Sequence, residues 1–135
     1  MKTLIIITSL LFVSSLFSQT AEDYYKKGLE QLNHDNIEGY NKAGEYFSKS
    51  LELDPNYYLS SYEMGKLYIR AISYDLALTE FTKVIMIAPN FSDAYIERGD
   101  IYRQSVDYKN ACNDFKKAQQ LGNKRAKEYL DQYCN

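Results

Sequence analysis

The sequence contains few residues whose types and spacing could support chemistry. Its only histidine, His34, stands beside Asn33, Asp35 and Asn36, which is the setting of an exposed loop residue rather than of a catalytic base. A zinc site of a common type would need a second histidine or a Cys-x-x-Cys pair, and the sequence has neither. It also lacks a glycine-rich phosphate loop and a Gly-x-Ser-x-Gly elbow. We therefore expect no enzyme, no cofactor, no metal site and no small-molecule substrate.

The first residues have the order of a secretory signal peptide. Lys2 precedes a largely apolar run over residues 4–13, and Ser14, Ser15 and Ser18 follow it. The apolar run is shorter than the roughly 20 residues that span a bilayer, so cleavage after Ser18, or after Ser15, is favoured over a retained membrane anchor. We expect an exported protein, periplasmic or secreted, without stable membrane insertion after cleavage.

The mature chain, residues 19–135, has the length of one domain. The whole sequence has 16 basic and 18 acidic residues, and loss of Lys2 brings the net charge to −3. Nucleic-acid-binding proteins usually carry a basic face, so this balance argues against a nucleic-acid partner. Two cysteines in an exported chain favour a disulfide between Cys112 and Cys134 over two free thiols.

The sequence contains an internal repeat. Residues of the same type recur at an interval of 34, and the recurring sets are Tyr40, Tyr74 and Tyr108; Ala43, Ala77 and Ala111; Phe47, Phe81 and Phe115; and Leu53, Ile87 and Leu121. Pairs at the same interval are Pro55 with Pro89, Gly65 with Gly99, and Tyr68 with Tyr102. So many matches at one interval indicate a repeated structural unit.

Each unit is predicted to be a hairpin of two helices. Ala77, Phe81 and Val84 follow the spacing of a helix that buries one face, and a second apolar stripe precedes them. Pro55 and Pro89 end the helices at the joints between units. Gly65 and Gly99 stand in mid-helix, where glycine costs about 1 kcal/mol, which predicts close helix approach with Ala77 and Ala111 as the opposing surface.

These residues resemble the tetratricopeptide repeat, a unit of about 34 residues with the pattern Trp-x-x-Leu-Gly-x-x-Tyr, then Ala-x-x-x-Phe, then Pro. The unit 58–91 matches with Met64, Gly65, Tyr68, Ala77, Phe81 and Pro89, and has Ser61 in the Trp place. The unit 92–125 matches with Tyr95, Gly99, Tyr102, Ala111 and Phe115, and has Asn123 in the Pro place. The unit 21–57 carries Tyr24, Gly28, Ala43, Phe47 and Pro55. Three extra residues in this first unit predict a longer turn over residues 34–42.

The resemblance implies an all-α fold, a right-handed superhelix (α-solenoid) of three hairpins. Each hairpin cannot bury its apolar faces alone, so a closing helix is needed after the last one. Residues 123–134 carry Ala126, Tyr129 and Leu130 at helical spacing and are predicted to form this capping helix. The cap would fold back antiparallel to the helix before it, with the joint near Gly122. Because Gly122 is ten residues after Cys112 and twelve before Cys134, the two cysteines come level. The alternative is that Cys112 is a small core residue and Cys134 lies in a frayed end.

The resemblance also implies a function, which is to bind a protein or peptide as an adaptor or scaffold outside the cytoplasm. The alternative is a stable assembly subunit of a cell-envelope complex. The first helix of each hairpin lines the peptide-binding groove in this family, and the corresponding residues here are Tyr25, Leu29, Leu32, Leu59, Tyr62, Lys66, Ile69, Asp93, Ile96, Asp100 and Arg103. We expect Tyr62 and Arg103 to be the main anchors, since aromatic and Arg side chains dominate interfaces.

The groove residues differ from those of the family members that hold a C-terminal carboxylate. Those members use a cluster of Lys, Asn and Arg, whereas Tyr25, Leu29, Ile96 and Asp100 stand at these places here. This difference argues against a carboxylate clamp. A second interpretation of Tyr25 and Leu29 is that they simply pack against the neighbouring helix.

Overall fold

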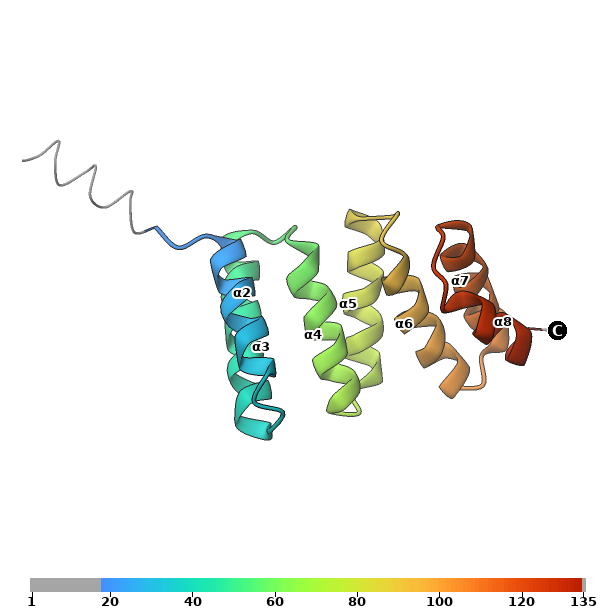
Figure 1. Ribbon diagram of the computed structural model, residues 1–135, viewed down its shortest axis with the longest axis horizontal. Coiled ribbons are helices and arrows are strands. Elements are labelled where there is room, and N and C mark those ends of the chain that lie inside the picture. The colour runs from blue at the N-terminus through green and yellow to red at the C-terminus, as the bar shows by residue number, and fades with distance from the viewer. Residues whose placement is uncertain (1–17, 135) are drawn as a thin grey trace, which may run out of the picture.

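The computed structural model describes residues 18–134, and within that range the chain forms seven helices and no strand. The helices are α2 (Ala21–Leu32), α3 (Ile37–Leu53), α4 (Tyr58–Arg70), α5 (Tyr74–Ile87), α6 (Ser92–Gln104), α7 (Tyr108–Gln120) and α8 (Ala126–Tyr133). Three antiparallel hairpins, α2–α3, α4–α5 and α6–α7, follow one another along the long axis, and α8 closes the row (Figure 1). The predicted all-α solenoid of three hairpins and a cap is confirmed.

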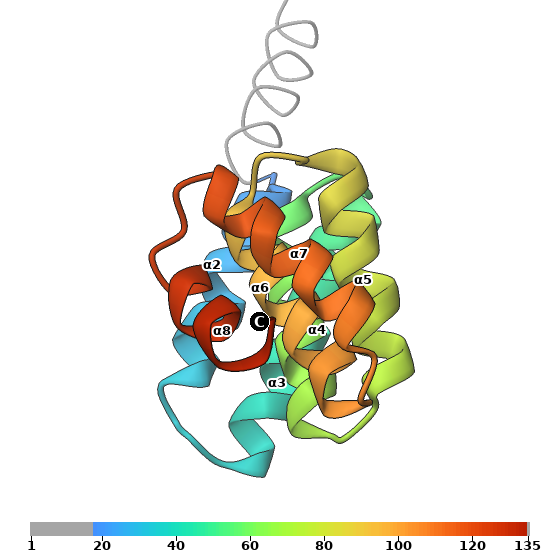
Figure 2. The same ribbon diagram turned by 90° about the vertical axis from the view of Figure 1, so that its right-hand side faces the viewer.

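The view along the long axis shows how the hairpins are stacked (Figure 2). Each helix contacts the helix before it and the helix after it in the chain, so the core is continuous from one hairpin to the next. Residues 1–17, which hold nearly all of the predicted signal peptide, lie outside the range that the structure describes. Within residues 18–134 the helices are all too short or too polar to cross a membrane.

Local sequence explains where several helices begin and end. Thr20 and Asp23 form a capping box at the start of α2, and the side chain of Asn36 accepts a hydrogen bond from Gly39 N–H at the start of α3. Asp107 caps α7 in the same way through Asn110 N–H. After α7 the chain reverses at Gly122, whose φ of +85° suits a residue without a side chain.

The mid-helix glycines allow a phenylalanine ring to lie against the helix backbone. A Cβ atom added to Gly28, Gly65 or Gly99 would lie 2.4–2.7 Å from ring atoms of the same hairpin's Phe47, Phe81 or Phe115. The predicted close approach is therefore present, and the nearest atoms at each glycine belong to the repeated phenylalanine ring. Ala77 and Ala111, the expected opposing surface, are buried in the same clusters as Phe81 and Phe115.

The first hairpin accommodates its three extra residues inside a helix. The turn between α2 and α3 covers residues 33–36, and α3 begins at Ile37, one turn before Tyr40. In the second hairpin the equivalent tyrosine, Tyr74, is itself the first residue of α5. The prediction of a long turn over residues 34–42 is therefore wrong, because Asn36 caps the helix early and leaves a turn of ordinary length.

The cap is fastened to the last hairpin by a disulfide and by hydrogen bonds. Cys112 on α7 and Cys134 at the end of α8 are bonded, with Cα atoms 5.6 Å apart, which is the predicted pairing. Asn123, in the place of the repeat's proline, donates from its side-chain amide to Ser92 Oγ (3.1 Å) and Asp93 Oδ1 (2.7 Å). Asn123 thus ties the α7–α8 turn to the start of α6.

Candidate functional site

The first helices α2, α4 and α6 carry the residues predicted to line a groove. Ten of those eleven residues are partly exposed. We call these ten residues the first-helix face, and they are Tyr25, Leu29, Leu32, Leu59, Tyr62, Lys66, Ile69, Asp93, Asp100 and Arg103. The eleventh, Ile96, is completely buried in a cluster with Ala111, Phe115, Ala118 and Ala126, and Leu130 of α8 packs against that cluster. The assignment of Ile96 to the binding surface is therefore wrong, because the cap covers it.

Tyr62 lies near the centre of this face, held against two other aromatic rings. Its ring meets Phe91 edge-on at a centroid distance of 5.0 Å and Phe81 at 5.8 Å. Burial raises the pKa of the Tyr62 phenol, and the carboxylates of Glu97 and Asp93 raise it further. The hydroxyl thus stays protonated at neutral pH and is available as a hydrogen-bond donor.

Two carboxylates of this part of the molecule, Glu63 and Asp100, are each paired with a cation on the same helix. Lys66 Nζ lies 3.0 Å from Glu63 Oε2, and Arg103 Nε lies 2.7 Å from Asp100 Oδ1. Both pairs are three residues apart on one helix, a spacing that brings side chains together. The cations remain more than a quarter exposed, with relative side-chain exposures of 44% for Lys66 and 26% for Arg103, so their charges remain accessible to a partner.

A third pair, between Glu97 and Arg125, was missed by the sequence reasoning. Arg125 Nη1 lies 3.0 Å from Glu97 Oε1, and Arg125 comes from the residue just before α8. The two residues are 28 positions apart, and no local spacing pairs them. The available indication was the interval of 34, which places α8 where the first helix of a fourth hairpin would lie and so brings its start beside α6.

Arg103 also contacts the cap. Its guanidinium lies 4.9 Å from the ring centroid of Tyr133, and its hydrogen bond to Asp100 raises its pKa. Arg103 is therefore held in place from two sides before any partner binds. A side chain that is already ordered loses less entropy on binding, which agrees with the prediction that Arg103 is an anchor.

Tyr25 is the clearest case of a predicted binding residue with a packing role. Its ring lies 6.0 Å from Phe47 in its own hairpin and 5.5 Å from Tyr57 at the start of the next one. Burial raises the pKa of the Tyr25 phenol, and nearby Glu63 adds to that rise. These contacts support the interpretation that Tyr25 packs between hairpins, while its partial exposure leaves one side open to solvent.

His34 lies apart from this face, in the turn between α2 and α3, and its side chain is exposed. Within residues 18–134 no three or more His, Cys, Asp or Glu side chains are grouped so that they could hold a metal ion. The site as described consists of aromatic, aliphatic and paired charged side chains. Aromatic and Arg side chains of this kind are enriched at protein interfaces.

The geometry agrees with the comparisons to known proteins. The sequence profile described as tetratricopeptide repeat matches residues 34–57 and 92–121. Among solved structures, a crystal structure of MamA superimposes with a TM-score of 0.70 at 29% identity, over 80% of this chain and 61% of that one. This chain thus spans under two thirds of the MamA chain. No protein among the curated sequences matches.

Two further structures resemble the chain over nearly their whole length. The first TPR of Spaghetti (RPAP3), bound to the HSP90 peptide SRMEEVD, has a TM-score of 0.77 at 19% identity and covers 87% of this chain and 92% of that one. The Arabidopsis OM64 TPR domain has a TM-score of 0.76 at 23% identity, covering 84% and 93%. At these identities the likeness shows the fold alone. The profile match shows tetratricopeptide repeats over residues 34–57 and 92–121, and the structural likeness together with the glycine–phenylalanine contact repeated in all three hairpins shows that the chain has the tetratricopeptide repeat fold.

Proposed function

We propose that the protein binds a protein or peptide segment on the first-helix face and acts as an adaptor or scaffold. The observation that carries the proposal is the setting of Tyr62, an aromatic side chain that packs on Phe81 and Phe91. Charged side chains of α4 and α6, among them Lys66 and Glu97, lie close to it. Rigid aromatic side chains within a polar rim are typical of binding hot spots.

The composition of the face indicates the kind of segment that would fit. Towards α2 the side chains are apolar, with Leu29 and Leu32, whereas towards α6 they are charged, with Asp93, Asp100 and Arg103. We propose a segment with apolar residues at one end and residues of mixed charge at the other. The structurally similar RPAP3 domain in complex with an HSP90 peptide supports a peptide as the ligand class.

We further propose that the protein works outside the cytoplasm. The support comes from the order of residues at the N-terminus and from the disulfide between Cys112 and Cys134, because disulfides persist in oxidising compartments. N-terminal sequencing of the protein from the culture medium and the periplasmic fraction tests this: a start at Gln19 supports export, and an intact Met1 in the cytoplasm contradicts it.

The binding proposal is tested by peptide selection followed by a matched pair of variants. Peptides would be selected from a random displayed library on the purified protein and then measured against Tyr62→Ala and Tyr46→Ala by fluorescence anisotropy. Tyr46 is a suitable control because it is also partly buried but lies on α3, a second helix. Tyr62→Ala should weaken binding about tenfold or more, which corresponds to a loss of about 1.4 kcal/mol or more of binding free energy. Tyr46→Ala should leave the affinity unchanged.

The fold of each variant must be checked, since Tyr62 also packs on two rings. Circular dichroism at the binding temperature gives this control. Equal affinity for the wild type and Tyr62→Ala, with both proteins folded, would show that the partner binds elsewhere. A transient adaptor should purify as a soluble monomer, whereas stoichiometric co-purification with one envelope protein would favour the alternative of a permanent assembly subunit.

A further inference from the structure

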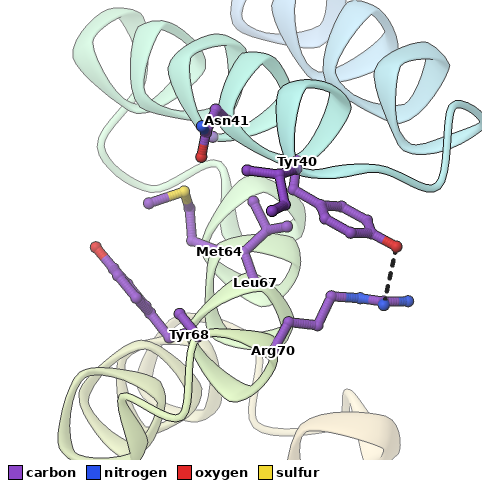
Figure 3. Close-up of a pocket in the computed structure, with 9 residues that line it drawn as sticks. Tyr40, Asn41, Met64, Leu67, Tyr68 and Arg70 are labelled. Atoms are coloured by element: carbon purple, nitrogen blue, oxygen red, sulfur yellow. Dashed lines mark hydrogen bonds between the residues drawn. The ribbon is translucent and has the colours of Figure 1, made fainter.

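An apolar cavity of about 400 Å³ lies between α3 and α4, on the side of α4 that the proposed binding face does not use. Its lining residues are Ile37, Tyr40, Asn41, Gly44, Met64, Leu67, Tyr68, Arg70 and Ala71. In Figure 3, Met64 and Tyr68 lie along one side and Tyr40 with Arg70 along the other, with Leu67 between them. We refer to it as the α3–α4 cavity. Its size and apolar lining are those of a ligand site.

The internal repeat explains why this cavity is present between the first two hairpins. Gly44, Leu78 and Cys112 occupy the same position, 34 residues apart, on the three second helices. Leu78 packs against the cluster that contains Ile101, the residue equivalent to Leu67, and Ile101 is only 1% exposed. At the last joint Cys112 is bonded to the cap. Gly44 has no side chain that could cover Leu67, so Leu67 stays partly exposed and the α3–α4 cavity remains open.

The cavity is separate from the first-helix face. Met64 is two residues from both Tyr62 and Lys66, which places it about 200° around α4, on the opposite side of the helix. Leu67, Tyr68 and Ala71 follow Met64 at helical spacing and line the cavity with it. A ligand in the cavity and a peptide on the first-helix face would therefore not exclude each other.

The charge at the rim of the cavity is positive. Arg70 is the only charged lining residue, and it makes no ion pair with any residue in the range 18–134. Its guanidinium lies 4.6 Å from the ring centroid of Tyr40 and donates to the Tyr40 hydroxyl at 3.0 Å. That hydroxyl in turn donates to the Asp35 carboxylate. Tyr40 thus orients the Arg70 guanidinium. Because the residue is exposed, the guanidinium remains accessible to a ligand.

The apolar surface continues beyond the cavity. Ile37, which lines it, is 78% exposed, and Ile72, directly after the lining residue Ala71, is 75% exposed. Exposed aliphatic residues beside an apolar cavity enlarge the apolar surface that a partner could cover. A small molecule inside the cavity would leave both isoleucines exposed, whereas a polypeptide could cover them.

We infer that the α3–α4 cavity is a second binding site, which takes a leucine-sized aliphatic side chain from an acidic segment of a partner protein. The aliphatic side chain of the partner would pack against Leu67, as the side chain of Leu78 packs against the cluster of the equivalent residue Ile101 in the next hairpin. The acidic residues of the segment complement Arg70, the one charged residue among those that line the cavity. This site lies beyond the proposed function, because its ligand need not be the segment that binds the first-helix face.

The site can be probed with N-acetyl-leucine, which combines the aliphatic side chain with one carboxylate. In a ¹H–¹⁵N NMR titration we expect saturable shifts at Gly44, Leu67 and Arg70, with a dissociation constant of about 1–10 mM for so small a ligand. N-acetyl-alanine should bind roughly tenfold more weakly because it leaves the cavity unfilled. N-acetyl-leucinamide should also bind more weakly, since it lacks the charge that Arg70 attracts.

Filling the cavity supplies the matched variants. Gly44→Leu copies Leu78 and should abolish the shifts, whereas Gly44→Ala, whose added Cβ lies 3.7 Å from Leu67, should only weaken them. Arg70→Gln should remove the preference for N-acetyl-leucine over its amide, and Arg70→Lys should restore it. Tyr62→Ala should leave the titration unchanged, which separates this site from the first-helix face.

A blocked peptide, acetyl-Gly-Leu-Glu-Glu-Gly-amide, distinguishes a protein segment from a small molecule. It should bind at least as tightly as N-acetyl-leucine and more tightly than the peptide with Lys-Lys in place of Glu-Glu. Binding of N-acetyl-leucine without the peptide would overturn the inference in favour of a small-molecule site. The inference is also overturned if Gly44→Leu shows the same shifts, or if no probe gives saturable shifts.

Discussion

Arg98 and Asp114 form a bidentate ion pair between the two helices of the third hairpin, with Nε–Oδ2 and Nη2–Oδ1 distances of 2.8 Å each. Arg98 Nη1 also donates to Thr82 Oγ1 on α5 at 3.2 Å, so one side chain joins three helices. The pair is nearly buried, with side-chain exposures of 18% and 8%. One repeat earlier the equivalent residues are Met64 and Glu80, and Glu80 Oε2 is buried without a hydrogen-bond partner.

We predict that Asp114→Ala lowers the free energy of unfolding by about 3 kcal/mol, because it leaves the Arg98 charge buried without its partner. The double variant Arg98→Met, Asp114→Leu should recover most of that loss, since it removes both charges. Urea denaturation measures both. Glu38→Ala is the control, because the exposed Glu38–Lys42 pair should contribute at most about 1 kcal/mol. An Asp114→Ala variant as stable as Glu38→Ala would contradict the structural role of the pair.

Two glycines in neighbouring helices should respond to the same substitution in opposite ways. At Gly65 an added Cβ would lie 2.7 Å from the Phe81 ring, whereas at Gly44 the nearest atom, Leu67 Cδ1, is 3.7 Å away. Gly65→Ala should therefore destabilise the protein by about 1–3 kcal/mol through overpacking. Gly44→Ala should stabilise it by about 0.5–1 kcal/mol, because alanine costs less backbone entropy in a helix. Thermal unfolding of the two variants checks the sign of each effect; two changes of the same sign would contradict this account.

The hairpins and the glycine positions could be predicted from the sequence because each depends on the interval of 34, and the cysteine pairing could be predicted because the cap folds back antiparallel to the helix before it. A residue such as Phe81 has the same neighbours as Phe115 wherever the repeat is regular. The start of α3 could not be predicted from the interval, because the first hairpin departs from it and the cap residue Asn36 decides where the helix begins. Local capping has to be read separately from the repeat.

The candidate site was less predictable than the fold, for a different reason. Ile96 stands at a position that faces outward in a regular repeat, but α8 lies over it. Tyr62 stands at the equivalent position on α4 and remains partly exposed. The difference between the two residues comes from the helix that packs after each hairpin, which a pattern within one hairpin does not contain. The α3–α4 cavity was missed for a related reason, since it depends on an absent side chain at Gly44 rather than on a residue that is present.

The disulfide between Cys112 and Cys134 should contribute to stability through α8. The two residues are separated by 22 positions, and closing a loop of this size stabilises by about 3 kcal/mol in the chain-entropy model. Cys112→Ser, Cys134→Ser and the double variant should each lower the free energy of unfolding by about that amount.

The expected mechanism can be checked by hydrogen exchange and by reduction. Amides of α8 and of the buried Ile96 should exchange faster in the variants than in the wild type, because the covalent tie that holds the cap over α6 is lost. A reductant should lower the melting temperature of the wild type to that of the double serine variant and leave the variant itself unchanged. Mass spectrometry after alkylation counts the free thiols. Two free thiols in the oxidised protein, or a melting temperature insensitive to reductant, would show that the cap is held by packing and by Asn123 alone.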